Sequence, residues 1–182
     1  MAAEESCPGR VRERLLASVR YFQHGISSPE RCSKPVIAAL EGNVIGAGVD
    51  LATACDLRYT TSDAKLSVKE VDLAIVADVG TMQRLPHLVG DQRARELTYT
   101  GRTFSGAQAC SYGLALEAYA TSEELWRGVG DVAKDIAAKS PLTVRGIKQV
   151  SLYTRDHPTD DALNHVAQWN AAALFSDDLD RI

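Results

Sequence analysis

The stretch that decides the fold is Pro35-Val-Ile-Ala-Ala-Leu-Glu-Gly-Asn-Val-Ile-Gly-Ala-Gly-Val-Asp-Leu-Ala-Thr-Ala-Cys-Asp56. It begins with a short unbroken apolar run, residues 35–40, which is typical of a strand covered on both faces. Glycines then crowd a turn within residues 41–50, and residues 51–56 have the pattern of a helix. The predicted order is therefore strand, glycine turn, helix.

The segments around this stretch predict further elements. Upstream, residues 1–10 are small and polar and are expected to be a frayed lead-in. Apolar positions in Val11–Phe22 then recur at helical spacing, with arginines on the other face, which predicts one amphipathic helix. Downstream, Leu57-Arg-Tyr-Thr-Thr61 and Lys65-Leu-Ser-Val-Lys69 predict two short strands.

The chain after Gly80 is predicted to be mostly helical. The expected helix starts are Ser105, Thr121 or Ser122, Pro141 after Ser140, and Thr159. The last helix carries one face of mainly apolar residues: Leu163, Val166, Ala167, Asn170 and Leu174. Trp126 and Trp169 are expected to pack against the core or a neighbouring subunit, with the core as the first expectation.

Length and composition set the broad class. The chain has 182 residues, a mass of 19.7 kDa, 45% hydrophobic residues and 24% charged residues, as expected for one soluble globular domain with a helical appendage. Its 20 basic and 24 acidic residues give a net charge of −4 with no basic stripe, which disfavours nucleic-acid binding. No apolar run approaches the ~20 residues of a membrane span.

Cysteine and histidine spacing predicts no metal site. Cys7, Cys32, Cys55 and Cys110 match no metal-binding or redox motif, so we expect free thiols in a reducing compartment inside the cell. The four histidines share no metal-ligand spacing either. The first residues carry neither a secretory nor a transit segment, so no targeting signal is predicted in this chain.

The glycine turn is the most informative chemical feature. Gly46-Ala-Gly-Val-Asp-Leu51 lies between a predicted buried strand and a predicted helix. The first backbone N–H groups of a helix lack intrahelical acceptors and stand at the positive end of its dipole, so such a turn can hold an oxyanion. It lacks the spacings of nucleotide-phosphate loops. The alternative is that these glycines only permit tight packing.

At several points the chain resembles the enoyl-CoA hydratase/isomerase, or crotonase, family. The resemblance rests on residues 34–40, Gly46-Ala-Gly-Val-Asp-Leu-Ala-Thr-Ala-Cys-Asp-Leu-Arg58, Leu85-Pro-His-Leu-Val-Gly90 and Ser105-Gly-Ala-Gln-Ala109. It implies an α/β fold with a crotonase-like ββα spiral core, incomplete in this chain, over residues 1–120. Residues 121–182 would form a C-terminal helical trimerisation region, so a homotrimer or hexamer is expected.

Two segments are similar to the dienoyl-CoA isomerase branch of that family. They are Lys69-Glu-Val-Asp-Leu-Ala-Ile-Val-Ala-Asp-Val-Gly-Thr-Met-Gln-Arg-Leu-Pro86 and Tyr153-Thr-Arg-Asp-His157. The resemblance implies an acyl-CoA thioester as substrate, no cofactor, no metal, and a mitochondrial or peroxisomal location. Because family members are longer, it also implies that an N-terminal part, with a second oxyanion donor and CoA-binding surface, is missing here.

The same resemblance implies a triplet of catalytic acids at Asp50, Glu70 and Asp78. An extended chain would separate Glu70 and Asp78 by ~26 Å, at ~3.3 Å per residue, so the chain must turn back near Ala77. Without the family context these acids would be taken as solvated surface groups. Clustered near Leu73, Ile75 and Val76 in an apolar pocket, they are expected to raise one another's pKa.

The implied reaction moves both double bonds of a 3,5-dienoyl-CoA into 2,4 conjugation. Glu70 would exchange the proton at C2 and Asp78 the proton at C6, with Asp50 assisting by orientation or charge. The backbone N–H of Ala47, between Gly46 and Gly48, would be one oxyanion donor for the thioester. Two alternatives stay open: an enoyl-CoA hydratase with a water between Asp50 and Glu70, and a non-catalytic crotonase-like subunit.

Overall fold

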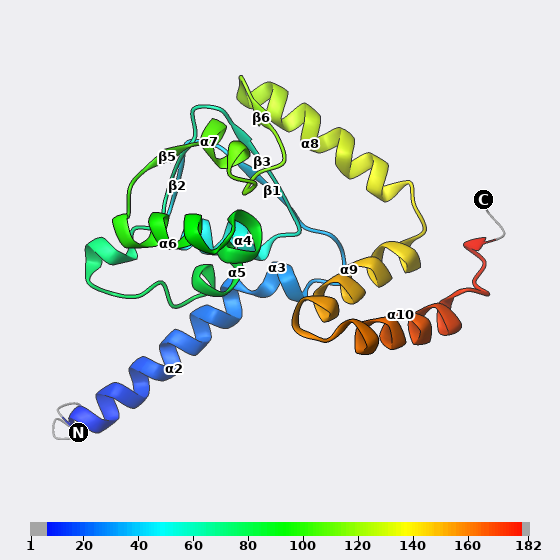
Figure 1. Ribbon diagram of the computed structural model, residues 1–182, viewed down its shortest axis with the longest axis horizontal. Helices are drawn as coiled ribbons and strands as arrows, with labels where there is room; N and C mark the ends of the chain where they lie inside the picture. Colours follow the sequence, from blue (N-terminus) through cyan, green and yellow to red (C-terminus); the bar gives the residue numbers. More distant parts are fainter. Residues whose placement is uncertain (1–6, 180–182) are drawn as a thin grey trace.

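The computed structural model describes residues 7–179 (Figure 1). The first half contains α2 (Pro8–Ile26), α3 (Ser28–Arg31), β1 (Ile37–Leu40), β2 (Asn43–Ile45), α4 (Ala47–Ala54), β3 (Leu57–Thr61), β4 (Lys65–Ser67), η1 (Glu70–Leu73) and α5 (Thr81–Val89). The second half contains α6 (Asp91–Thr100), β5 (Phe104–Ser105), α7 (Gly106–Ser111), β6 (Ala118–Tyr119), α8 (Ser122–Ala137), α9 (Pro141–Asp156) and α10 (Thr159–Ala173).

The strands form two small sheets that the chain visits in turn. One sheet has the order β1-β3-β6 and the other β2-β4-β5. β1 pairs with β3 in parallel, from Ile37 opposite Leu57 to Leu40 opposite Thr60, and β2 pairs with β4 in parallel. The first two turns of the chain each add one strand to each sheet before a helical segment follows, whereas in the third turn α7 lies between β5 and β6. This is the ββα spiral that the resemblance implied.

The main core lies between these sheets and the helices that follow them. α4 to α7 and the two sheets bury one cluster of apolar side chains: Leu40, Val44, Val49, Ala52, Ala64, Leu66, Val68, Ala77, Leu85, Ala94, Leu97, Phe104, Ala109, Leu114 and Ala115. Burial of apolar surface is the dominant favourable contribution to folding. The cluster fixes α4 and α5 on the sheets, and these two helices carry much of the site described below.

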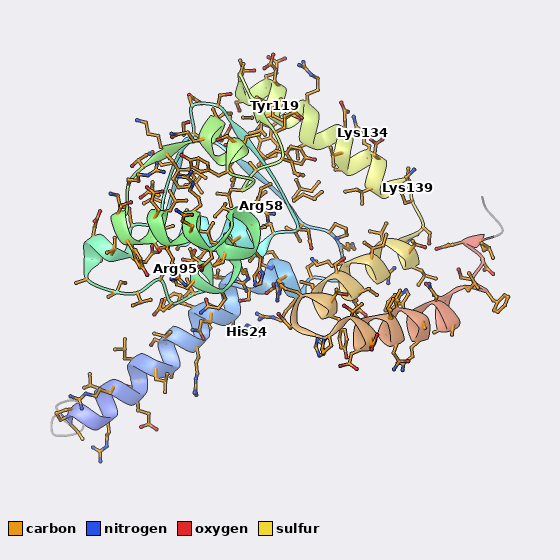
Figure 2. All side chains as sticks on the ribbon, in the orientation of Figure 1. His24, Arg58, Arg95, Tyr119, Lys134 and Lys139 are labelled. Carbon is orange, nitrogen blue, oxygen red and sulfur yellow. The ribbon has the colours of Figure 1, made fainter. Side chains whose placement is uncertain are left out.

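A second cluster joins α8 to the first sheet. Leu125 and Val129 of α8 bury themselves with Tyr59 of β3 against partly buried side chains of β1 and β6. The outward side of α8 carries Lys134, labelled in Figure 2, whose side chain is 79% exposed. The predicted division of the chain between residues 120 and 121 stays a prediction.

Three helices extend from this body (Figure 1). α2 projects away from it, and α9 and α10 lie side by side as a hairpin on the opposite side. The apolar face predicted for α2 is present, but Leu15 and Phe22 are 63% and 61% exposed. Lys148 anchors α9 to the body, because its buried ammonium group donates to Asp56 and to the backbone oxygens of Pro29 and Lys34.

Most predicted elements are confirmed, and the structure corrects four details. The strand at residues 37–40 is half-buried rather than covered on both faces. The glycine-rich stretch contains β2, and α4 begins at Ala47 rather than at residue 51. Trp126 is 56% exposed and therefore lies outside the core. In α10 the buried residue is Ala162, whereas Leu163 and Leu174 are exposed.

The helix starts predicted from capping residues are confirmed. Ser105 and Gln108 form a reciprocal capping box at α7, and the Thr121 and Ser140 side chains accept N–H bonds at the starts of α8 and α9. Within residues 7–179, no helix combines the length and apolar character that a membrane crossing requires. The predicted lead-in at residues 1–6 lies outside the described residues.

Candidate active site

The start of α4 forms one side of the candidate site. Gly46 has φ 54° and ψ −116°, a backbone conformation that L side chains rarely adopt, and it directly precedes Ala47. No side chain caps this helix start, so its first N–H groups are left to other acceptors. Ala47 lies within the helix and is exposed, so its Cβ is compatible with the local conformation.

Asp50, in the first turn of α4, is completely buried. Its Oδ1 accepts a 2.6 Å hydrogen bond from the backbone N–H of Thr81, the first residue of α5. Its Oδ2 is buried without a hydrogen-bond partner among the described residues. Asp50 therefore ties the start of α5 to α4 and keeps one carboxylate oxygen available for another group.

Glu70 begins η1 and faces the glycine turn. A Cβ at Gly46 would lie 3.0 Å from Glu70 Oε1, so the carboxylate contacts the backbone where α4 starts. Oε2 is buried and has no partner among the described residues. Burial raises the pKa of Glu70, and the negative charges of Asp50 and Asp78 raise it further. Hydrogen bonds from the backbone of Glu70 and Lys69 lower the pKa but do not outweigh these effects.

Asp78 lies in the segment that joins η1 to α5. Its backbone oxygen accepts a 2.7 Å hydrogen bond from Gln23 Nε2 of α2, and it lines a cavity of about 490 Å³. The Asp78 side chain is exposed. The negative charge of Asp78 contributes to the raised pKa of Glu70, which supports the predicted turn of the chain between the two acids. The turn contains Ala74, which has φ 57° and is the one residue other than glycine with a positive φ among those described.

The structure thus brings Glu70 against Gly46 at the start of the helix that carries Asp50, whereas Asp78 acts on Glu70 through its charge and lines a cavity that includes neither of the other two acids. The expected mutual rise in pKa is confirmed for Glu70, although its largest cause is burial. The apolar residues nearby in sequence, Leu73, Ile75 and Val76, are 71%, 53% and 73% exposed, so they do not enclose the acids.

Sequence reasoning missed the residues that hold the acids in place. Gln23 lies 55 positions from Asp78, and Thr81 lies 31 positions from Asp50, so no local pattern links either pair. Gly80 could have been found, because a glycine directly before a predicted helix is a possible cap. It has φ 133° and is the N-cap of α5.

The arrangement is suited to moving protons beside a developing negative charge. Buried Asp50 and half-buried Glu70 each have one buried carboxylate oxygen without a hydrogen-bond partner among the described residues, and the uncapped start of α4 lies against Glu70. A carboxylate with a raised pKa is a better base near neutral pH than an ordinary one. No group of three or more His, Cys, Asp or Glu side chains within residues 7–179 is arranged to hold a metal ion.

Comparison with protein families and curated proteins gives a consistent result. A family model described as enoyl-CoA hydratase/isomerase matches residues 17–177. The peroxisomal delta(3,5)-delta(2,4)-dienoyl-CoA isomerase of Arabidopsis thaliana is 50% identical over 171 residues, which is 94% of this chain and 62% of that protein. The human mitochondrial delta(3,5)-delta(2,4)-dienoyl-CoA isomerase is 44% identical over 93% of this chain and 52% of its own length.

Solved structures share the fold. The enoyl-CoA hydratase of Bacillus anthracis superposes with a TM-score of 0.85 at 32% identity, covering 91% of this chain and 64% of that one. A putative enoyl-CoA hydratase of Thermobifida fusca, solved in complex with acetoacetyl-CoA, has a TM-score of 0.85 at 30% identity, covering 91% and 65%. The chain spans less than two thirds of the length of each of these relatives.

Proposed function

This chain belongs to the enoyl-CoA hydratase/isomerase family, and from that premise we propose that it converts a 3,5-dienoyl-CoA to the conjugated 2,4-dienoyl-CoA. The observation that carries the proposal is the contact of the Glu70 carboxylate with Gly46 at the start of α4, in the electrostatic field of Asp50 and Asp78. This contact supports the proposal because it brings a carboxylate of raised pKa next to a helix start without a side-chain cap. The names of the relatives from Arabidopsis and human support the choice of reaction.

In this mechanism Glu70 is the base and Asp78 the acid. Glu70 removes the proton at C2, and the electron pair forms the C2–C3 double bond. The C3–C4 double bond then moves to C4–C5, and the electrons of the C5–C6 double bond take a proton at C6 from Asp78. Two groups are needed because C2 and C6 are too far apart for one carboxylate. Proton exchange with water restores both acids.

The negative charge that develops on the thioester oxygen would be stabilised by the N–H of Ala47. Gly46 permits the turn that presents this N–H, and Gly48 follows Ala47 in the first turn of α4, where a Cβ would make an ordinary 3.5 Å contact with Val44 Cγ1. Preorganised donors of this kind commonly supply the largest single catalytic contribution. Asp50 assists by accepting the hydrogen bond of the Thr81 N–H and by its charge on Glu70.

Partner, assembly and compartment are part of the same proposal. The bound acetoacetyl-CoA of the Thermobifida structure supports an acyl-CoA thioester as ligand. We expect a homotrimer or hexamer formed through the C-terminal helices, which sedimentation equilibrium would test. The relatives are named as peroxisomal or mitochondrial proteins, so one of these organelles is the expected location.

The test is an ultraviolet assay for the conjugated product. Purified protein receives a 3,5-dienoyl-CoA, and the absorbance of the 2,4-dienoyl-CoA is followed. Glu70→Gln and Asp78→Asn are each expected to lower the rate by ~10²- to 10⁴-fold, the usual contribution of a general acid or base. Glu123→Gln and Asp131→Asn on α8 make the same chemical changes away from the site and should leave the rate unchanged.

Other outcomes would overturn the proposal. Isomerisation that survives both Glu70→Gln and Asp78→Asn would refute the assigned mechanism. Hydration of a 2-enoyl-CoA without diene isomerisation would favour the hydratase alternative, in which Asp50 and Glu70 hold a water. A folded oligomer that neither reacts with nor binds CoA thioesters would identify a non-catalytic subunit.

A further inference from the structure

We propose that Arg84 is a positioning residue for Asp78, and that Glu30 and Arg155 hold Arg84 in place, so that α9 helps to set where this acid stands. The catalytic consequence rests on the proposed function, but the positioning itself does not. Arg84 would act on the segment from Asp78 to Thr81.

That segment is anchored at each end. Gln23 Nε2 donates to the backbone oxygen of Asp78 at 2.7 Å, and the Thr81 N–H donates to buried Asp50 at 2.6 Å. Between these anchors lies Gly80, whose φ of 133° excludes a normal side chain. A third contact is therefore needed to hold the middle of the segment, where the backbone is most permissive.

The Arg84 guanidinium provides that contact. It lies so close to Gly80 that a Cβ there would overlap Nη1. Nη1 is buried and has no hydrogen-bond partner among the described residues. A buried N–H group without a hydrogen-bond partner costs free energy. The position of the Arg84 side chain is therefore not explained by its ion pair with Glu30 alone. It does place the guanidinium directly against the backbone beside Asp78.

Glu30 fixes the orientation of Arg84. Glu30 Oε2 accepts from Arg84 Nη2 at 2.7 Å and from Nε at 3.3 Å, while Ser27 Oγ accepts from Nη2 at 2.8 Å. Glu30 Oε1 also pairs with Arg155 Nη1 of α9. Burial acts to raise the pKa of Glu30, but the bonds and charges of Arg84 and Arg155 outweigh it and lower the pKa. Glu30 is thus ionised and shared between two arginines.

Glu30 also connects two distant sequence segments. Arg84 belongs to residues 69–86 and Arg155 to residues 153–157, the two segments that are similar to the dienoyl-CoA isomerase branch. The proton route of the proposed function uses the first segment and leaves the second without a role. Their meeting at Glu30 gives Arg155 one: it completes the support of the arginine that contacts the segment next to Asp78.

The test compares two arginines of matched exposure. Arg155 and Arg102 side chains are 33% and 32% exposed, and each pairs with a glutamate, but Arg102 pairs with Glu96 and not with Glu30. Arg155→Met and Arg84→Met are therefore compared with Arg102→Met. The readouts are hydrogen exchange of the Thr81 N–H and the titration of Glu70 followed by carboxyl carbon NMR, both on the full chain without substrate.

Arg84→Met is expected to speed exchange at Thr81 by roughly three- to tenfold, as expected if the hydrogen bond from the Thr81 N–H to Asp50 loses its net stabilisation. It should also lower the pKa of Glu70 towards its ordinary value, because Asp78 is no longer held near it. Arg155→Met should change both readouts in the same direction by less, and Arg84→Lys should restore part of the loss. Arg102→Met should change neither.

The result that would overturn the proposal is a folded Arg84→Met and Arg155→Met that match Arg102→Met in both readouts. If Arg84→Met does not fold, Arg155→Met and Arg84→Lys decide the question. With 3,5-dienoyl-CoA, loss of positioning should lower kcat by ~10- to 100-fold at nearly constant KM. A wild-type chain without isomerase activity would refute the proposed function while leaving the exchange and titration results to decide the role of Arg84.

Discussion

Replacing Gly46 by alanine is expected to destabilise the protein and displace Glu70 in one step. The backbone at Gly46 has φ 54°, and forcing a residue with a side chain into such a conformation costs ~1–3 kcal/mol. The new Cβ would also lie 3.0 Å from Glu70 Oε1, which is closer than an ordinary contact. The carboxylate must therefore move by a few tenths of an ångström or the helix start must shift.

The effect of the Gly46 backbone on the free energy of unfolding can be separated from the effect of adding a methyl group by comparison with Gly48→Ala. Gly48→Ala lies inside α4, and its Cβ would make an ordinary 3.5 Å contact with Val44 Cγ1. Alanine in a helix is favoured over glycine by ~0.5–1 kcal/mol. Gly46→Ala should therefore lower the free energy of unfolding by ~1–3 kcal/mol, which corresponds to a fall in Tm of roughly 2–12 °C for a chain of this size, whereas Gly48→Ala should leave it unchanged or higher.

Urea denaturation followed by circular dichroism measures both differences, provided that the slope of unfolding free energy against urea is the same in the three proteins. In the isomerase assay, Gly46→Ala should lose more activity than its stability loss explains, since Glu70 is displaced. A Gly46→Ala protein as stable as wild type, or a Gly48→Ala protein destabilised equally, would refute the claim that the backbone at Gly46 sets this site.

Three further predictions test single features of the structure. Folding raises the pKa of Glu70, so the folded state favours the protonated carboxyl group. The stability that this group contributes is complete below its ordinary pKa of 4.5 and is lost as the pH rises through the folded pKa. Thermal unfolding across a pH series should therefore show that Glu70→Gln is more stable relative to wild type between pH 5 and 8 than at pH 4. Arg58, labelled in Figure 2, is buried and donates to the backbone oxygens of Leu114, Cys55 and Ala52. Because these oxygens would lose their donor, Arg58→Met should lower the free energy of unfolding by ~3 kcal/mol or more in urea denaturation. An unchanged midpoint would contradict this. Ala74 has φ 57°, so Ala74→Gly should stabilise the protein by ~0.5–1 kcal/mol in the same assay, and a loss of stability would show that the turn carries no strain.

The sequence by itself determined the local structure and the family. The apolar run at Ile37–Leu40, the capping residues Ser105, Thr121 and Ser140, and proline at position 141 specify elements through neighbours within four positions, so their signals can be read directly. The segments that carry the family resemblance likewise predict a triplet of catalytic acids at Asp50, Glu70 and Asp78. That these three acids form a catalytic site, and the role of each in the reaction, stay proposals.

Only the tertiary structure decided which groups surround these acids. Spacing could not show that Asp50 holds the Thr81 N–H, that Glu70 contacts Gly46, or that Arg155 reaches Arg84 through Glu30. It also could not show that Leu73, Ile75 and Val76 are exposed. These contacts join residues 24 to 125 positions apart, and they form because two sheets and their covering helices bury a common core, a long-range condition that no local pattern encodes.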